Sequence, residues 1–405
     1  MNGQIRDGKL GPPLRGARLA NAISMAVIIL MAIGTVMVFS AGANVSQNLD
    51  LKHFYDFAII RQILFLPLAV AVMLTVSLFD YHHLSLEKGW SFRNLIKSPL
   101  VYLLILSVGL LILVLTPIGA EVNYARRWLR LPFGPTYISF QPSELAKWMV
   151  VFFLAAYCSE YTQLLQSFRR GFVPVCFFVA LIVGLIIVED FGTAAFICLL
   201  AGGMLLIGGA KCWHLLTPIP FAGGLFYYTL VTSPSRLQRL AAFLRPDKWA
   251  QTAAYQANQS LAAIGSGGIW GKGLGRGICK YGHLPEDTSD FIFAIIGEEL
   301  GFIGVVVVIG LFIALILLGL KAALYSNDRL GRLLATGIVL SIGLQAAINI
   351  GVATVVLPTK GIPLPFVSAG GTSLLLSAVA VGLLLNIAKQ STPPQHATTG
   401  MKEPC

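Results

Sequence analysis

Five carboxylates gather where the chain turns apolar, in a protein with only 18 acidic residues: Glu286, Asp287, Asp290, Glu298 and Glu299. A carboxylate at such a boundary can cap a helix, neutralise a cation or accept a proton. Asp290 directly precedes an apolar run, which is an N-cap-like position. Glu298 and Glu299 lie roughly 12 to 13 Å deeper along the same helix, too deep to cap it. We therefore expect them to be protonated or to pair with a buried cationic side chain such as Arg61 or Lys147.

Basic side chains accompany these carboxylates. Arg126 and Arg127 lie with Arg130 in one segment between two apolar runs, where they indicate an anionic ligand. Arg61 lies inside an apolar run, where an ionisable group is costly and usually faces the interior of a helix bundle. Lys360 lies in a segment rich in proline and glycine, Leu357 to Ser373, which we expect to dip into a cavity.

The sequence does not decide the roles of two further pairs of polar residues. Glu144 and Lys147 are three residues apart after Pro142, so they share one face at the start of a helix. They fit a structural ion pair and a site role equally well. Glu189 and Asp190 form a tight turn between two apolar runs, and Glu189 is the weaker site candidate because such a turn can be hydrated.

The elements that must position these groups are membrane helices. The 405 residues are 56% hydrophobic and only 12% charged, which excludes a soluble fold. Runs of about 18 or more apolar residues can each cross a bilayer. The sequence predicts an all-α polytopic membrane protein with ten transmembrane helices, at 22–41, 57–79, 99–116, 143–158, 172–188, 192–209, 213–231, 291–320, 333–354 and 373–388.

The distribution of charge predicts the orientation of these helices. An even number of crossings puts both termini on one side, and that side carries +9 of the net charge of +11. Both termini should therefore be cytoplasmic, and nucleic acid need not be invoked. We expect a cytoplasmic tail over 1–21, a membrane domain over 22–389 and a cytoplasmic tail over 390–405. The first apolar run resembles a signal peptide but is long enough to be an uncleaved span.

A large outer loop, 232–290, separates the seventh and eighth predicted spans. Its first half, Ser235 to Arg245, predicts an amphipathic helix with basic residues on one face. Its second half is rich in glycine but lacks the Gly-Lys-Ser/Thr ending of a nucleotide-binding loop. We expect flexible backbone there, with exposed N–H groups and basic side chains.

Several motifs together resemble the SEDS family, the shape, elongation, division and sporulation proteins. They are Arg127-Trp128, Phe140-Gln-Pro-Ser-Glu-Leu-Ala-Lys147, Asp190-Phe-Gly-Thr193, Tyr255 to Gly268, Leu284-Pro-Glu286, Asp290 to Gly301, Leu357-Pro-Thr-Lys-Gly361 and Leu364-Pro-Phe366. The resemblance covers nearly the whole chain in order, and the motifs are more similar to FtsW-type than to RodA-type members. Departures occur at Thr288-Ser-Asp290, at Ser368-Ala-Gly-Gly-Thr-Ser373 and at Ser139, where the family often has a basic residue.

The resemblance implies an inverting peptidoglycan glycosyltransferase that polymerises lipid II at the outer face of the bacterial plasma membrane. It implies Asp290 as the general base, and the cations Arg61, Arg127, Lys147 and Lys360 as ligands of the diphosphate. Gln141, Glu144 and Asp190 would orient the basic groups or the sugar, Trp128 would pack against a sugar or lipid, and Ser368 would help to bind substrate. Glu286 and Asp287 would lie at the cavity rim.

The resemblance also implies partners and leaves alternatives. A class B penicillin-binding transpeptidase and other division proteins are the expected partners. A divalent cation, Mg²⁺ or Mn²⁺, bridging the diphosphate and a carboxylate fits the chemistry, although the sequence has no evident ligand set. The competing functions are a lipid II flippase, a lateral-wall polymerase and a scaffold for the transpeptidase.

Overall fold

The computed structural model describes residues 12–42, 58–86, 98–122, 125–133, 136–279 and 288–391. A helix lies at each of the ten predicted positions, and the described part of the chain adds a small antiparallel sheet that an all-α prediction omits. The long helices are α1 (Pro12–Gly42), α2 (Ala58–Val76), α4 (Pro99–Leu115), α5 (Pro142–Glu160), α7 (Val173–Ile187), α8 (Phe191–Ile207), α10 (Ile219–Val231), α13 (Ile292–Tyr325), α14 (Arg329–Ala353) and α15 (Gly371–Gln390).

Shorter elements connect them. They are the helices α6 (Thr162–Leu165), α9 (Cys212–Leu216), α11 (Pro234–Leu244) and α12 (Tyr255–Gly267), the 3₁₀ helices η2 (Tyr81–Leu84) and η4 (Pro246–Trp249), the π-helix η3 (Phe168–Phe172), and the strands β1 (Ala120–Val122), β2 (Ala125–Phe133) and β3 (Thr136–Phe140). The predicted helix over 213–231 is divided into α9 and α10. Proline begins or nearly begins α4, α5, α7, α10 and α11, where its missing N–H costs nothing.

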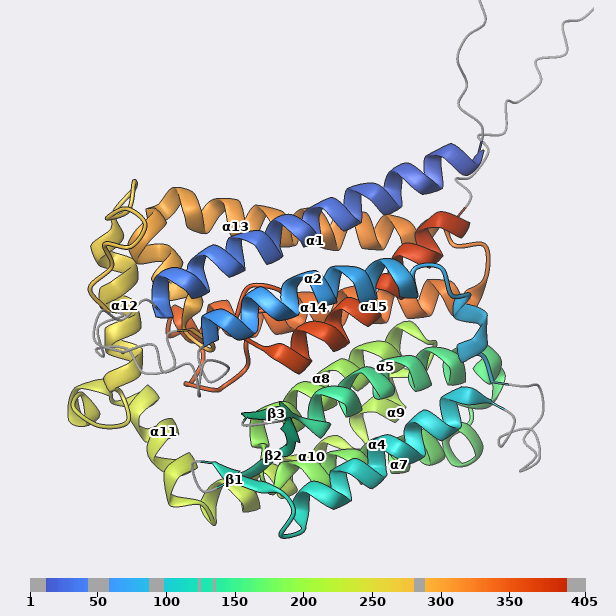
Figure 1. Cartoon of the computed structure of the whole chain (residues 1–405). Coiled ribbons are helices and arrows are strands. Elements are labelled where there is room, and N and C mark those ends of the chain that lie inside the picture. The colour runs from blue at the N-terminus through green and yellow to red at the C-terminus, as the bar shows by residue number, and fades with distance from the viewer. Residues whose placement is uncertain are drawn as a thin grey trace, which may run out of the picture.

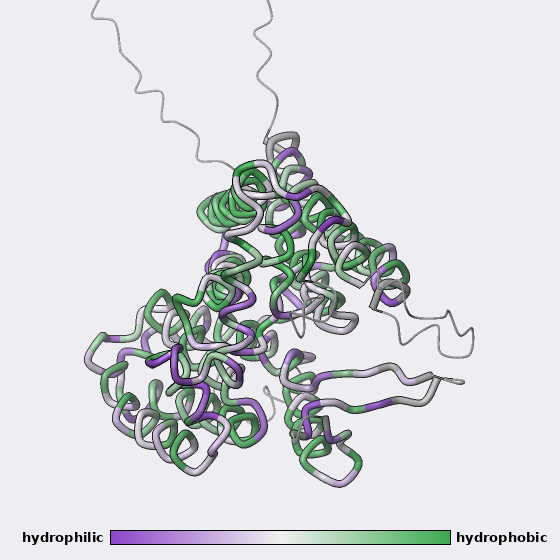
Figure 2. Tube along the Cα trace, turned by 90° about the vertical axis from the view of Figure 1, so that its left-hand side faces the viewer, coloured by the Kyte–Doolittle hydropathy of each residue, from purple (hydrophilic) through white to green (hydrophobic). Residues whose placement is uncertain are grey.

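The protein is a multi-pass membrane protein. Five described helices are long and apolar enough to cross a bilayer: α1, η3 joined to α7, α13, α14 and α15. The pair α9–α10 and α11 passes the same test together, but α11 is bent away by 97°. The shorter apolar helices include α2, α4 and α8. Hydrophobic residues are found along most of the helices (Figure 2). The count of ten crossings stays a prediction.

The helices run side by side, and the two ends of the bundle differ (Figure 1). The first turns of α1 pack on the last residues of α15, since a Cβ on Gly16 would lie 2.8 Å from the carbonyl oxygen of Lys389. The beginning of α1 and the end of α15 therefore lie at one end, as the even number of predicted crossings requires. Helices α11 and α12 lie at the other end (Figure 1). The amphipathic helix predicted from Ser235 is confirmed as α11.

The glycine-rich loop after α12 has a role that differs from the prediction. Helix α13 is broken at Gly301, where φ is +65° and a Cβ would lie 2.3 Å from the amide of Gly271. The amides of Phe302 and Ile303 donate instead to the carbonyls of Gly268 and Ile269. The loop thus supplies the hydrogen bonds that a break in a membrane helix requires.

Glu298 and Glu299 hold the same loop, and the expected pairing with Arg61 or Lys147 is wrong. Glu298 accepts from Lys272 Nζ at 2.7 Å and from the amides of Ile278 and Cys279. Glu299 accepts from the amides of Gly275 and Gly277 and from Ser40 Oγ of α1, at 3.1, 3.2 and 2.6 Å. The N–H groups that were expected to be exposed therefore bind these two buried carboxylates.

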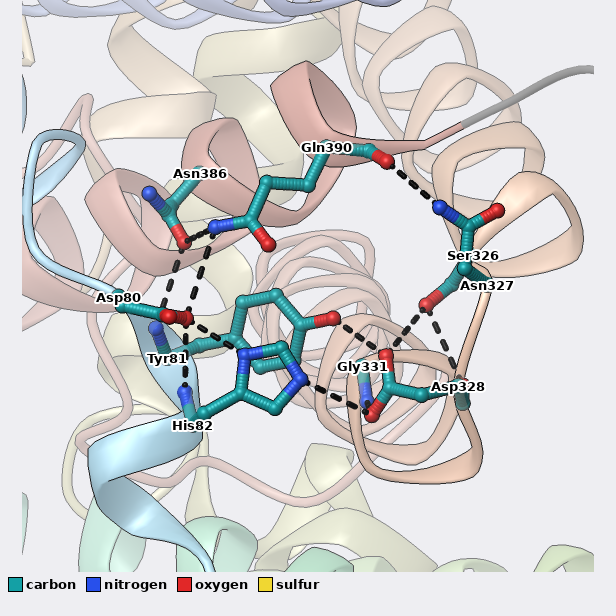
Figure 3. A network of polar contacts seen from close by, with 9 residues as sticks. All are labelled: Asp80, Tyr81, His82, Ser326, Asn327, Asp328, Gly331, Asn386 and Gln390. Carbon is teal, nitrogen blue, oxygen red and sulfur yellow. Dashed lines mark hydrogen bonds and ion pairs between the residues drawn. The ribbon is translucent and has the colours of Figure 1, made fainter.

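A second polar network closes the end of the bundle where α1 begins (Figure 3). Asp328 caps α14 by accepting from the amide of Gly331 at 3.1 Å, and it also accepts from the Tyr81 hydroxyl. His82 Nδ1 lies 2.6 Å from Asp80 Oδ1. The side chain of Asn327 donates to the carbonyl of Gln390 at 2.9 Å. These bonds join the α2–α4 connection, the α13–α14 turn and the end of α15.

Candidate active site

A cavity of about 700 Å³ lies at the end of the bundle that carries α11 and α12. Its walls come from the beginnings of α2, α13 and α15, from β2 and β3, from the turn before α8, and from the α14–α15 loop. The polar and charged lining residues are Arg61, Gln62, Arg127, Ser139, Gln141, Asp190, Arg239, Gln256, Ser289, Asp290, Thr359, Lys360, Thr372 and Ser373. Trp128 also lines this cavity. The structure therefore brings together seven of the ten predicted site residues.

One wall of the cavity is strongly cationic. Lys360 Nζ lies 3.9 Å from the centre of the Phe191 ring, and the guanidinium of Arg236 lies 5.5 Å from the same centre. Burial is the main cause that lowers the pKa of Lys360 to about 8; Asp190 opposes this shift, and the guanidinium groups of Arg236, Arg239 and Arg127 add to it. Such a concentration of positive charge favours an anionic ligand.

Backbone carbonyls hold two of these arginines in place. Arg127 Nε donates to the carbonyl of Glu189 at 2.8 Å, and the Glu189 side chain accepts from the amide of Arg126 at 2.8 Å. The Arg236 guanidinium donates to the carbonyl of Val188 at 2.6 Å and to that of Thr229 at 3.1 Å. Strand β2 and helix α11 are therefore both tied to the α7–α8 turn, which positions Arg127 and Arg239 at the cavity.

Asp290 lies in the turn before α13, one residue before the N-cap, which is Phe291, so the alternative interpretation of Asp290 as the cap is not supported. The Asn349 side chain donates to the carbonyls of Asp290 and Ile362, at 2.9 and 2.8 Å. Asp290 Oδ2 lies 2.8 Å from the position of a Cβ built on Gly361, next to Lys360. The turn and the α14–α15 loop thus place a carboxylate in the same cavity as these cations.

Ser368 contacts the turn that carries Asp290 and the α14–α15 loop. Its hydroxyl donates to the carbonyl of Ser289 at 2.5 Å and accepts from the amide of Leu364 at 2.7 Å. A third bond runs from the amide of Ala369 to the carbonyl of Thr288 at 2.9 Å. Ser368 therefore joins the loop to the turn that carries Asp290, whereas it does not line the cavity among the described residues.

Glu144 and Lys147 also lie beneath the cavity, where the predicted ion pair is confirmed at 2.8 Å. Their side chains are only 8% and 2% exposed. Lys147 donates to Gln345 Oε1, and Glu144 accepts from Ser373 Oγ, each at 2.8 Å. The pair supports the lining residue Ser373 and the α14 residue Gln345 from helix α5, which packs against α4, α8 and α14.

Asp190 and Gln141 line the cavity from helix ends. Asp190 caps α8, accepting from the amide of Thr193 at 3.1 Å and from its hydroxyl at 2.8 Å. Gln141 precedes α5 and donates to Ser143 Oγ at 3.1 Å. Both oxygens of the Asp190 carboxylate therefore accept hydrogen bonds from Thr193 of α8. Glu286 and Asp287 lie outside the described residues.

Sequence reasoning missed Arg239 and Gln256 as lining residues. Arg239 follows Arg236 by three residues in an amphipathic helix, a spacing that places both on one face and was a usable signal. Gln256 had no such signal, since only the packing of α12 brings it to the cavity. In the described residues, no group of three or more His, Cys, Asp or Glu side chains is placed to hold a metal ion.

The fold and the cavity define a class: a multi-pass helical membrane protein with a cation-rich cavity at one end of its bundle and a carboxylate beside the cations. The chain belongs to the FtsW/RodA/SpoVE family of cell cycle proteins, whose family model matches residues 20–393. This is the family that the sequence motifs predicted.

Relatives along the whole chain agree with this assignment. A protein of Coxiella burnetii named "Probable peptidoglycan glycosyltransferase FtsW" is 38% identical over 377 residues, 91% of this chain and 96% of that protein. "Stage V sporulation protein E" of Bacillus subtilis is 38% identical over 368 residues, 90% and 95% of the two chains. Within the family the chain is closer to FtsW, since three relatives of that name are 37 or 38% identical over at least 90% of this chain.

Solved structures confirm the fold. A chain from the structure titled "Structural coordination of polymerization and crosslinking by a peptidoglycan synthase complex" superposes with a TM-score of 0.69 at 26% identity. The alignment covers 90% of this chain and 96% of that one. The Thermus thermophilus RodA structure superposes with a TM-score of 0.61, covers 91% and 96%, and supports the fold alone.

Proposed function

We propose that this protein is a peptidoglycan glycosyltransferase that polymerises lipid II into glycan strands for septal wall synthesis. The observation that carries the proposal is the position of Asp290 beside Gly361 in a cavity that Lys360, Arg61, Arg127 and Arg239 also line. The likeness to proteins named peptidoglycan glycosyltransferase FtsW supports the substrate and the septal role.

The geometry suits an acceptor hydroxyl that attacks an anomeric carbon while an undecaprenyl diphosphate departs. Asp290 takes the proton of the attacking hydroxyl as general base. Because one displacement needs no nucleophile from the enzyme, the anomeric configuration inverts. The cations stabilise the negative charge that develops on the departing diphosphate, and arginine suits phosphate oxygens through paired N–H donors. Gln141 and Trp128 are placed to contact the sugars.

The remaining predicted residues do not contact the reacting atoms, and they act by supporting or balancing the groups that do. Lys147, Glu144 and Ser368 support the cavity walls, and Asp190 balances the charge of the cations as it caps α8. Asp190 and Asp290 are the carboxylates lining the cavity in the described part of the chain, and Asp190 is bonded to Thr193. A divalent cation, Mg²⁺ or Mn²⁺, would add positive charge for the departing diphosphate, and these two carboxylates are the cavity groups that could hold it.

Orientation and partners complete the proposal. We place both termini in the cytoplasm, because the positive charge concentrates at that end, so the cavity faces the outside of the bacterial inner membrane. A class B penicillin-binding transpeptidase and other division proteins would join the polymerase. The solved synthase complex, whose title couples polymerization with crosslinking, supports such a partnership.

Purified protein mixed with lipid II in detergent tests the function directly. Glycan polymer, separated on a gel, is the expected product, with or without an added class B transpeptidase. A flippase would instead move lipid II between the leaflets of a vesicle and make no polymer. The position of the cavity at one end of the bundle favours the polymerase. Complete absence of polymer in both mixtures would contradict the proposal.

The substitution Gly361→Ala should lower the polymerisation rate by roughly 100-fold, which is the effect of misplacing a catalytic group by about 1 Å. The added Cβ would lie 2.8 Å from Asp290 Oδ2, so the carboxylate must move. Gly370→Ala is the matched control, because its Cβ has no neighbour closer than 3.6 Å in the same loop. Equal rates for Gly361→Ala and Gly370→Ala would show that the position of Asp290 is not critical.

The lowered pKa of Lys360, about 8, predicts a pH dependence. Below pH 8 the lysine is positively charged and attracts the diphosphate, whereas the charge is lost as the pH rises through 8. The value of kcat/KM for lipid II should therefore fall by about tenfold between pH 7 and pH 9, because this ratio reports groups of the free enzyme. In Lys360→Arg the charge persists and the fall should disappear. The same fall in the arginine variant would assign the dependence to another group.

A further inference from the structure

A second cavity, of about 370 Å³, lies at the opposite end of the bundle. It is bounded by the beginning of α1, the end of α13 and Ser391 directly after α15. In the described part of the chain it shares no lining residue with the first cavity. The polymerase mechanism does not use it.

The lining changes from basic to apolar with depth. Arg18 lies near the beginning of α1, and Ala22 is four residues, roughly 6 Å, further into the bundle. Helix α13 runs the other way, so Leu318 is three residues, roughly 4.5 Å, deeper than Lys321. The cations therefore lie towards the membrane surface and the aliphatic groups towards the bilayer interior. This order matches an amphiphile with a charged headgroup.

The charge of the cavity selects an anion. Arg18 and Lys321 are its charged lining residues among those described, and Lys321 Nζ lies 5.7 Å from the ring centre of Tyr325. Two described carboxylates at this end of the bundle are engaged elsewhere: Asp328 caps α14 and accepts from Tyr81, and Asp80 contacts His82 (Figure 3). Two cations above an apolar wall fit a phosphate group that carries acyl chains.

We propose that this cavity binds one anionic phospholipid from the cytoplasmic leaflet, with its phosphate between Arg18 and Lys321. The acyl chains lie along Leu19, Ala22 and Leu318. The bound lipid fills the space between α1 and α13 and connects both to the end of α15.

Native mass spectrometry of the delipidated full-length protein tests the proposal, with phosphatidylglycerol and phosphatidylcholine as probes. Wild type should bind one phosphatidylglycerol in preference to phosphatidylcholine. The variant Arg18→Gln/Lys321→Gln should bind phosphatidylglycerol roughly 30-fold more weakly, the combined effect of two basic residues near an anionic lipid surface, and phosphatidylcholine unchanged. The charge-conserving variant Arg18→Lys/Lys321→Arg should retain the preference.

Arg332→Gln is the control for overall charge, because Arg332 is exposed at the same end and does not line the cavity. It should bind both lipids as wild type does. Thermal unfolding and lipid II polymerisation are measured on each variant, and they establish that the charge-neutral variant, Arg18→Gln/Lys321→Gln, is folded. Equal binding of the two lipids by wild type would overturn the proposal. So would an undiminished preference in the charge-neutral variant, or competition by soluble glycerol phosphate at the concentration of the lipid.

Discussion

Asp290→Asn is expected to lower the rate of glycan polymerisation by roughly 10²- to 10⁴-fold, the usual contribution of a general base. The amide has nearly the same shape as the carboxylate but cannot accept the proton of the attacking hydroxyl. Binding of lipid II should persist, because the cationic wall that includes Lys360 and Arg127 is unchanged. Single-turnover rates with labelled lipid II, together with lipid II binding in detergent, measure the two effects separately.

Asp247→Asn provides the matched control for the loss of a carboxylate. Asp247 lies in η4, is exposed and does not line the cavity among the described residues. It should polymerise at the wild-type rate. If Asp290→Asn also polymerised at that rate, another group would have to accept the proton.

The largest effect on stability is expected from Lys147→Met. The substitution leaves the carboxylate of Glu144, whose side chain is 8% exposed, buried without its cation, and it also removes the donor to Gln345. Breaking a buried ion pair in this way typically costs about 3–5 kcal/mol of the free energy of unfolding. Unfolding by increasing SDS in mixed micelles, followed by circular dichroism, gives the difference from wild type.

The double variant Glu144→Gln/Lys147→Met should recover part of this loss, because the unpaired charge is then absent. Polymerisation by the double variant distinguishes support from direct contact. A stable Lys147→Met protein that no longer bound lipid II would instead mean that Lys147 contacts the diphosphate.

Local sequence was sufficient for the helices and for part of the site. Each predicted apolar run corresponds to a helix because hydropathy and backbone hydrogen bonding act over neighbouring residues, and the Glu144–Lys147 pair follows from a spacing of three. The partners of Glu298 and Glu299 were wrong for the opposite reason. A buried carboxylate binds whatever donors the fold brings to it, and here a loop 20 to 26 residues earlier supplies Lys272 and several amides.

The sequence by itself determined that this protein is a multi-pass membrane protein of the SEDS family and that Asp290 and Lys360 belong to its motifs. Only the tertiary structure decided that Asp290 lies beside Gly361, that Lys360 and Arg239 line the same cavity, and that Lys147 and Ser368 support the walls. Membrane insertion depends on the composition of each segment, which is local. The cavity depends on how helices distant in sequence pack, as when Asn349 of α14 holds the carbonyl of Asp290.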